Sequence, residues 1–210
     1  MRPILLAGVL AGTLALAGCA STLTESQCLA SDWQTVGYRD GIAGVQSSQL
    51  LNHQNACVKH GVVPDRNAYL AGWREGVYQY CQPGNGFAVG ERGAGYANVC
   101  PAELEDAFQA AYREGRQLYV AQSEINQIYA GISQREGRIQ SIKQELASIT
   151  AAMISPESTA ADRAAMLLTA KDLAEEQGRL EEEIQSLKAE VAYKSEELRA
   201  LRTSLASVDY

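Results

Sequence analysis

Residues 125–153 read INQIYAGISQREGRIQSIKQELASITAAM, and this stretch decides the fold. Its large apolar side chains recur at steps of three and four residues, with one step of seven. They are Ile125, Ile128, Ile132, Ile139, Ile142, Leu146, Ile149 and Met153. This is the a/d pattern of a heptad repeat, interrupted by Arg135. The stretch therefore predicts a long amphipathic helix with a seam for a second helix.

A second heptad frame follows a break at Ser155-Pro156 and runs from Met166 to Val208. One break between two frames predicts an antiparallel coiled-coil hairpin over residues 121–210, with its turn near 155–156. Each arm would hold about fifty residues and measure roughly 75 Å. We expect Arg135 to lie level with Glu175 or Glu176 and to pair with one of them. Self-association through spare seam surface is the alternative.

The residues before 121 contain one motif three times: a small residue, an aromatic, Arg, an acid and Gly. The copies are Gly37-Tyr38-Arg39-Asp40-Gly41, Gly72-Trp73-Arg74-Glu75-Gly76 and Ala111-Tyr112-Arg113-Glu114-Gly115. The two small residues of each copy are four apart, so they share one helix face and let backbones approach closely. Helix starts are predicted at Ser31 or Asp32, at Asp65 and at Pro101. We expect the three helices to pack on one another.

Two interpretations of this motif stay open. In the first, the three arginines form salt bridges with acids of other copies and the aromatics fill the core. In the second, they line a ligand pocket made by Arg39, Arg74, Arg113, Tyr38, Trp73 and Tyr112. The glycine-rich residues 82–99 are predicted to form a loop, which lacks the Gly-Lys-Ser/Thr of a phosphate-binding loop.

The N-terminus is predicted to be a lipoprotein signal peptide, residues 1–18. Arg2 is followed by an apolar stretch from Ile4 to Leu16, which is too short to span a bilayer. Leu16-Ala17-Gly18-Cys19 resembles the bacterial lipobox, which implies that Cys19 is lipidated, with acyl chains such as palmitate. Ala20 and Ser21, in place of an Asp, favour the periplasmic face of the outer membrane. The alternative is an ordinary secretory signal with an unmodified Cys19.

Four more cysteines remain: Cys28, Cys57, Cys81 and Cys100. In an oxidising compartment they predict two disulfides, and we prefer Cys28–Cys57 with Cys81–Cys100 among the three possible pairings. His53, Cys57 and His60 share a helix face in a zinc-like spacing. We expect no metal there, because an oxidised cysteine is not a ligand and no acid accompanies the three.

Composition excludes several classes of function. The 210 residues carry 25 acidic against 18 basic side chains, a formal net charge of -7, which argues against a nucleic-acid partner. No nucleophile elbow, and no paired carboxylates in a pocket-like context, are present. We therefore expect no enzymatic activity and no cofactor.

The order of Trp, Gly, Cys and Tyr landmarks carries a resemblance to a known family. These landmarks include Asp32-Trp33, Gly37 to Gly41, Cys57, His60-Gly61, Tyr80-Cys81, Gly95-Tyr96 and Cys100-Pro101. Over about residues 19–120 the chain resembles a family of bacterial lipoproteins that share a domain of unknown function (DUF2799). The resemblance implies an envelope lipoprotein and supplies no catalytic residue.

Together these observations predict a mainly α protein. A small disulfide-linked helical head, residues 19–120, is expected to precede the hairpin, residues 121–210. We expect a lipid-anchored periplasmic scaffold that binds a partner protein through the coiled coil. The alternative is a head that binds a small ligand or a peptidoglycan fragment through the repeated motif.

Overall fold

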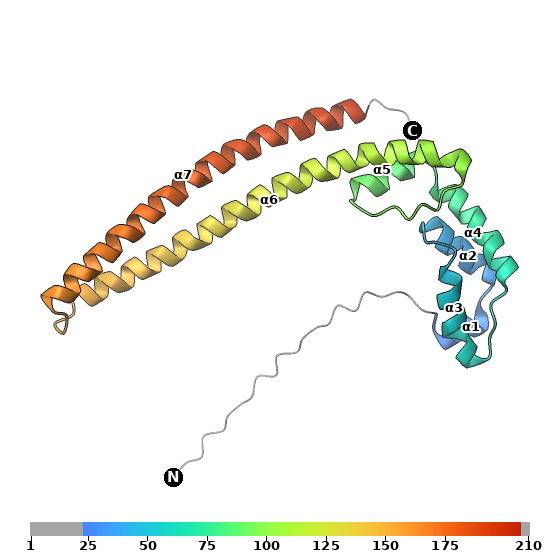
Figure 1. The fold of residues 1–210 in the computed structure, drawn as a ribbon, viewed down its shortest axis with the longest axis horizontal. Coiled ribbons are helices and arrows are strands. Elements are labelled where there is room, and N and C mark those ends of the chain that lie inside the picture. Colours follow the sequence, from blue (N-terminus) through green and yellow to red (C-terminus); the bar gives the residue numbers. More distant parts are fainter. Residues whose placement is uncertain (1–22, 207–210) are drawn as a thin grey trace, which may run out of the picture. The chain divides into compact units, whose positions relative to one another are not determined.

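The computed structural model describes residues 23–206, and these are helical with no strand (Figure 1). The predicted signal peptide and Cys19 lie outside the described residues. The chain divides into two compact units, Met1–Val77 and Tyr78–Tyr210. The mainly α fold is confirmed, and so are both preferred disulfides, Cys28–Cys57 and Cys81–Cys100. No helix among residues 23–206 combines the length and the apolar character needed to cross a bilayer.

The first unit contains α1 (Glu25–Ala30), α2 (Trp33–Ile42), α3 (Gln49–Cys57), the 3-10 turn η1 (Val58–His60) and most of α4 (Arg66–Tyr80). Two of the predicted helix starts, at Asp32 and Asp65, are confirmed. The Asp32 carboxylate accepts a hydrogen bond from the backbone N–H of Gln34, and the Asp65 carboxylate accepts from Asn67 and Ala68. Each acid satisfies N–H groups that a helix leaves unpaired in its first turn. The core of this unit is built from Cys28, Trp33, Val36, Cys57 and Tyr69.

Glycines hold α2 against α4. A methyl group placed on Gly37 would lie 1.9 Å from the carbonyl oxygen of Tyr69, and one on Gly72 would lie 1.9 Å from that of Gln34. Gly41 and Gly76 are equally crowded by backbone atoms of the facing helix. The prediction that the small face of the motif brings backbones together is therefore confirmed for the first two copies.

The predicted loop 82–99 is wrong in its first half, because α5 (Pro83–Glu91) forms there. Pro83 suits the first turn of a helix, where its missing N–H has no partner to lose. Gly86 and Gly90 are four residues apart, and the space a side chain would need is taken by backbone oxygens of Phe108 and Tyr112. These glycines are helix-packing residues, and the glycine content was misread as a turn signal.

The third copy of the motif, on α6 (Ala102–Met153), packs against α5. A methyl group on Gly115 would lie 2.1 Å from the carbonyl oxygen of Phe87. The small face of the third copy therefore packs on α5. The glycine contacts form two separate pairs, α2 with α4 and α5 with α6.

These two helix pairs share their glycine spacing, their helix ends and the position of their disulfide. Gly37, Gly41 and Gly44 have the same spacing as Gly86, Gly90 and Gly93. Gly44 and Gly93 have φ of 68° and 72°, the left-handed conformation that ends a helix and suits glycine. In each pair a disulfide joins the segment before the first helix to the segment before the second. We call residues 28–77 the first repeat and residues 81–119 the second repeat.

The predicted hairpin is confirmed as α6 and α7 (Ala160–Leu205), which run side by side in Figure 1. Part of the predicted seam is buried in one cluster. Its members are Ile125, Ile132, Ile139, Ile184, Val191 and Leu198, together with Leu118, which precedes the predicted seam. The helix that carries the third motif copy continues into the first arm without a break, so the predicted boundary at residue 120 falls inside α6.

The register of the hairpin corrects one prediction. Arg135 pairs with Glu183, with 2.6 Å between Nε and Oε2, and not with Glu175 or Glu176. The turn predicted near 155–156 is the segment 154–159, which lies between α6 and α7. Because Thr159 and Asp162 form a capping box that starts α7 late, the residues level with Arg135 lie further along α7.

Candidate functional site

The three motif arginines are exposed. Arg39 and Arg74 belong to the first unit, whereas Arg113 belongs to the second and donates a 3.4 Å hydrogen bond to Gln109. Among the described residues of the first unit, no ion pair joins Arg39 to Glu75 or Arg74 to Asp40, so these two copies do not form the salt bridges of the first interpretation.

The motif aromatics have different surroundings. Tyr38 is half-buried. The Trp73 indole donates a 2.7 Å hydrogen bond to the carbonyl of Val45, and the Tyr112 hydroxyl donates a 2.9 Å bond to that of Ala94. Val45 and Ala94 each follow the glycine that ends the first helix of their repeat. Trp73 and Tyr112 therefore fasten equivalent turns to the second helix of each pair.

A buried polar cluster lies at the centre of the first repeat. Oδ2 of Asp40 lies 2.8 Å from Nε2 of His53 and accepts a 2.6 Å hydrogen bond from the Tyr69 hydroxyl. His53 is only 3% exposed, and its Nδ1 has no hydrogen-bond partner. Burial, with the bond to Asp40, raises the pKa of Tyr69 above its ordinary 10.0, so its hydroxyl stays a donor. The cluster joins α2, α3 and α4.

The second repeat fills the corresponding space with apolar side chains. Val89 and Phe108 occupy the positions of Asp40 and Tyr69, and both are buried. The rings of Tyr80 and Tyr96 pack on Phe108, with centroids 5.2 Å and 4.8 Å away. Burial, with a hydrogen bond to Glu105, raises the pKa of Tyr96 to about 12. The polar cluster is therefore a feature of the first repeat only.

Sequence reasoning missed this cluster. In one interpretation of the motif Asp40 pairs with an arginine of another copy, and the sequence pattern around His53 suggests only a metal-ligand spacing. The three residues are separated by 13 and 29 positions along the chain, which gives no local signal. One signal was present: Asp40 is the aspartate among the motif acids, whereas the other copies have Glu75 and Glu114.

The zinc-like spacing of His53, Cys57 and His60 does not assemble a ligand set. Cys57 is bonded to Cys28, so it offers no thiolate. His53 faces Asp40, and Nδ1 of His60 lies 3.7 Å from Oε2 of Glu25. In the described part of the chain, no group of three His, Cys, Asp or Glu side chains is arranged to hold a metal ion.

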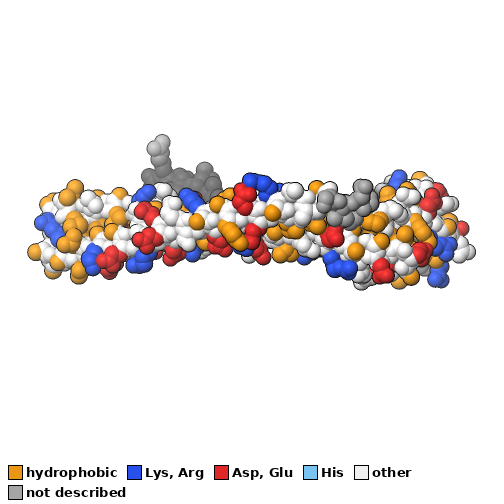
Figure 2. All heavy atoms as spheres, turned by 90° about the horizontal axis from the view of Figure 1, so that it is seen from above, with side chains coloured by type: hydrophobic (Ala, Val, Ile, Leu, Met, Phe, Trp, Pro, Cys, Tyr) orange, Lys and Arg blue, Asp and Glu red, His pale blue; other side chains and the backbone are white. Residues whose placement is uncertain are grey.

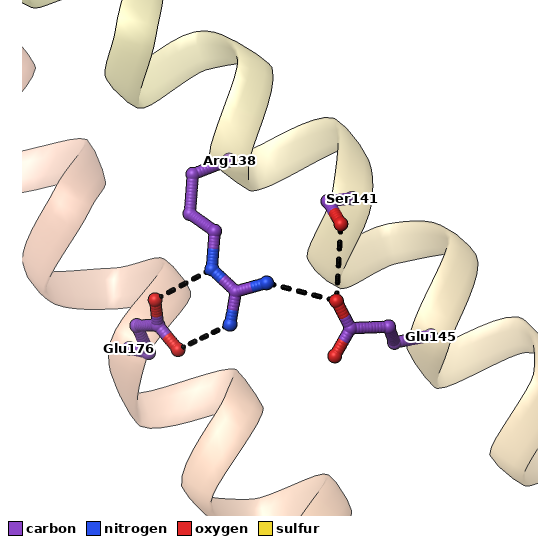
Figure 3. A network of polar contacts seen from close by, with 4 residues as sticks. All are labelled: Arg138, Ser141, Glu145 and Glu176. Atoms are coloured by element: carbon purple, nitrogen blue, oxygen red, sulfur yellow. Dashed lines mark hydrogen bonds and ion pairs between the residues drawn. The ribbon is translucent and has the colours of Figure 1, made fainter.

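A polar network fixes the register of the hairpin (Figure 3). Arg138 donates two hydrogen bonds to Glu176 on α7, at 2.8 Å and 2.9 Å, and a third to Glu145, which also accepts from Ser141. A bidentate pair of this kind restricts both distance and orientation. The bond from Arg138 lowers the pKa of Glu176 below its ordinary value. The network holds the two arms in one alignment.

Beyond this network, the end of the hairpin is apolar and exposed. Ile154, Leu167 and Leu168 are 80%, 61% and 65% exposed, and we call them the tip patch. Hydrophobic side chains gather at this end of the hairpin, at the left of Figure 2. Between residues 146 and 170 the only charged side chains are Glu157, Asp162 and Arg163. The tip therefore differs from the rest of the hairpin, which is densely charged.

Comparison with known families gives a match over part of the head region. Residues 32–117 match the family described as "Protein of unknown function (DUF2799)". No curated protein and no solved structure matches the chain. The matched residues begin at the cap of α2 and end in α6, so they span both glycine-packed helix pairs.

Proposed function

We propose that the protein is a lipid-anchored lipoprotein of the bacterial envelope that binds a partner protein through its hairpin. It acts as a scaffold and catalyses no reaction. The observation that carries the proposal is the tip patch, an exposed apolar surface at the end of a long helical hairpin. Exposed apolar side chains that gather at one end of a domain are typical of interaction sites.

The proposed anchor is Cys19. The lipobox Leu16-Ala17-Gly18-Cys19 supports cleavage before Cys19 and its acylation. Two or three acyl chains hold a protein stably at a membrane, whereas one chain binds reversibly. Ala20 and Ser21 support retention at the periplasmic face of the outer membrane.

The anchor is tested by metabolic labelling with an alkynyl palmitate, followed by membrane fractionation. The parent chain should incorporate the label and sediment with outer membranes. Cys19→Ala should abolish labelling and release the protein from the membrane. Equal labelling of parent and variant would contradict the anchor and leave the rest of the proposal untouched.

The partner surface is tested with a photo-crosslinking amino acid at Leu167 in intact cells. Tyr193 is the matched control, because it is also on α7 and is 66% exposed, close to the 61% of Leu167. We expect one discrete adduct from position 167 and none from position 193. Ile154→Lys should remove that adduct, because a charge in the tip patch opposes apolar contact. Equal adducts at both positions would contradict the proposal.

A head that binds a small ligand is the second candidate. The observation that favours it is that Arg39 and Arg74 are exposed and have no ion-pair partner among residues 23–206. A peptidoglycan fragment with free carboxylates is the proposed ligand. Calorimetric titration with muropeptides should show binding that Arg39→Glu or Arg74→Glu weakens at least tenfold, whereas Arg92→Glu leaves it unchanged. No heat of binding would exclude this candidate.

A further inference from the structure

A hollow of about 550 Å³ opens on the first unit between α3, the segment that follows η1, and α4. Leu50 and Leu51 line it from α3, Val63 from the connecting segment, and Leu70 from α4. Leu51 and Val63 are 61% and 74% exposed, so much of this apolar wall faces solvent. The volume falls within the roughly 300–1,000 Å³ of small-molecule sites.

The hollow has one charged side chain, Arg66, at the start of α4. Arg66 is exposed and has no ion pair or hydrogen bond among the described residues, and no Asp or Glu lines the hollow. The neighbouring Asp65 is engaged elsewhere, since its carboxylate accepts the N–H groups of Asn67 and Ala68 at 2.9 Å and 3.0 Å. Ser47, Ser48 and Gln54 also line the hollow, and they are uncharged. Its aliphatic side chains and its single unpaired cation complement a ligand with an apolar body and one anionic group.

The frame of the hollow is held rigidly. The Cys28–Cys57 disulfide fastens the C-terminal end of α3, and His53 fastens its middle to Asp40 and, through it, to Tyr69. The second repeat has no helix at the position of α3 and no polar cluster. The first repeat therefore contains α3 and the polar cluster, which the second repeat lacks, and the hollow lies along α3.

The lining also discriminates between ligand classes. It contains no aromatic side chain on which a sugar ring or a base would stack. Its walls are helices and a short connection, and they offer no open sheet edge for an extended peptide. An acyl chain needs neither feature, because it requires only aliphatic surface and one partner for its head group.

We propose that this hollow binds a fatty acid, with the acyl chain against Leu50, Leu51, Val63 and Leu70 and the carboxylate at Arg66. The ligand differs from that of either function proposed above, and the site belongs to the first unit, whereas the tip patch belongs to the second. The inference does not depend on the lipid anchor.

The test uses residues 20–210, exported to the periplasm so that the disulfides form, and purified without detergent. The probe is dansyl-labelled undecanoate, whose fluorescence rises in an apolar site. The parent chain should bind it saturably with one site. The methyl ester of the same probe should bind at least fivefold more weakly, because it lacks the charge that Arg66 recognises.

Two variants with matched controls locate the site. Leu51→Glu should weaken binding at least tenfold, whereas Leu167→Glu, at an equally exposed leucine of the tip patch, should change it less than twofold. Arg66→Glu should weaken binding of the acid at least tenfold and leave the ester unchanged, whereas Arg74→Glu on the same helix should have no effect. The circular dichroism spectrum and the absence of free thiols establish that each variant is folded.

Three results would overturn the proposal. The first is no saturable binding of the probe by the parent chain. The second is equal weakening by Leu51→Glu and Leu167→Glu, which would place the probe on exposed leucines in general. The third is loss of probe binding with Arg74→Glu but not with Arg66→Glu, which would place the carboxylate of the probe at the repeated motif.

Discussion

The first and second repeats share their backbone plan and differ in what fills their centres. Both pair two helices through glycines, both end the first helix at a left-handed glycine, and both fasten the following turn with an aromatic hydrogen bond. The first repeat has Asp40, His53 and Tyr69 at its centre, whereas the second has Val89 and Phe108. Glycine spacing therefore sets the architecture, and the central side chains decide whether an additional helix can dock.

The disulfides offer the largest test of this comparison. Replacing Cys28 and Cys57 by Ser, or Cys81 and Cys100 by Ser, should lower the free energy of unfolding by about 3 to 4 kcal/mol in each case, because each bond restricts the unfolded chain. The first pair closes the longer loop, with a sequence separation of 29 against 19, so its loss should be slightly larger. Urea unfolding followed by circular dichroism measures both. A smaller loss of unfolding free energy for the Cys28 and Cys57 variant than for the Cys81 and Cys100 variant would contradict this expectation.

The packing glycines give the next largest effect. Gly72→Ala and Gly115→Ala should each cost about 3 kcal/mol, because the new methyl group meets backbone that cannot move aside. Gly137 is the matched control, since nothing lies within 4 Å of a methyl group placed there. Gly137→Ala should raise stability by about 0.5 to 1 kcal/mol through helix propensity. Thermal unfolding of the three variants separates packing from propensity, and a stabilised Gly72→Ala would refute the close approach.

The central polar cluster is tested by converting it to the second repeat's composition. Asp40→Val should cost about 2 kcal/mol, because it leaves two buried groups, on His53 and Tyr69, without their partner. Asp40→Val combined with Tyr69→Phe should cost less than the two single changes added together, because their effects are coupled. Chemical unfolding of the single and double variants measures the coupling. Strict additivity would mean that Asp40 and Tyr69 do not act as a unit.

The smallest effect concerns the aromatic bonds to the turns. Trp73→Phe and Tyr112→Phe should each reduce stability by about 1 kcal/mol, since each removes one hydrogen bond to a backbone carbonyl. Hydrogen exchange should show faster opening of the turn after α2 in the first variant and after α5 in the second. Exchange that quickens in both turns with either variant would mean that the repeats open together.

The parts of the fold that follow a regular period could be predicted from the sequence. The isoleucines from Ile125 to Ile142 defined the hairpin because a seam must recur every three or four residues. The preferred disulfide pairing is confirmed, although a helix and not a loop occupies residues 83–91 between Cys81 and Cys100. The register around Arg135 did not, because it depends on where the Thr159 cap starts α7. Several residue types can cap a helix, so the sequence alone does not show at which of them α7 begins, and tertiary packing decides it.

The missed elements have a different physical cause. Pro83 and the glycines after it have a strong turn propensity, and tertiary packing against α6 overrides it. The spacing of Gly86, Gly90 and Gly93 repeats that of Gly37, Gly41 and Gly44. This match is the sequence signal that a packing helix like α2 precedes Gly93. The contacts of Asp40 with His53 and Tyr69, and the hollow beside α3, depend on long-range docking that no local pattern encodes.

The unbroken course of α6 has a mechanical consequence. One helix of 52 residues, about 78 Å long, begins beside the Cys81–Cys100 bond and ends at the hairpin tip. A helix without proline resists bending, and the Arg138 network ties it to a second one. A push or a twist at the tip is therefore delivered to the base of the second repeat instead of being absorbed along the way. The N-terminal end of α6 is held in place by the Cys81–Cys100 disulfide, so a force on the hairpin tip acts on that end.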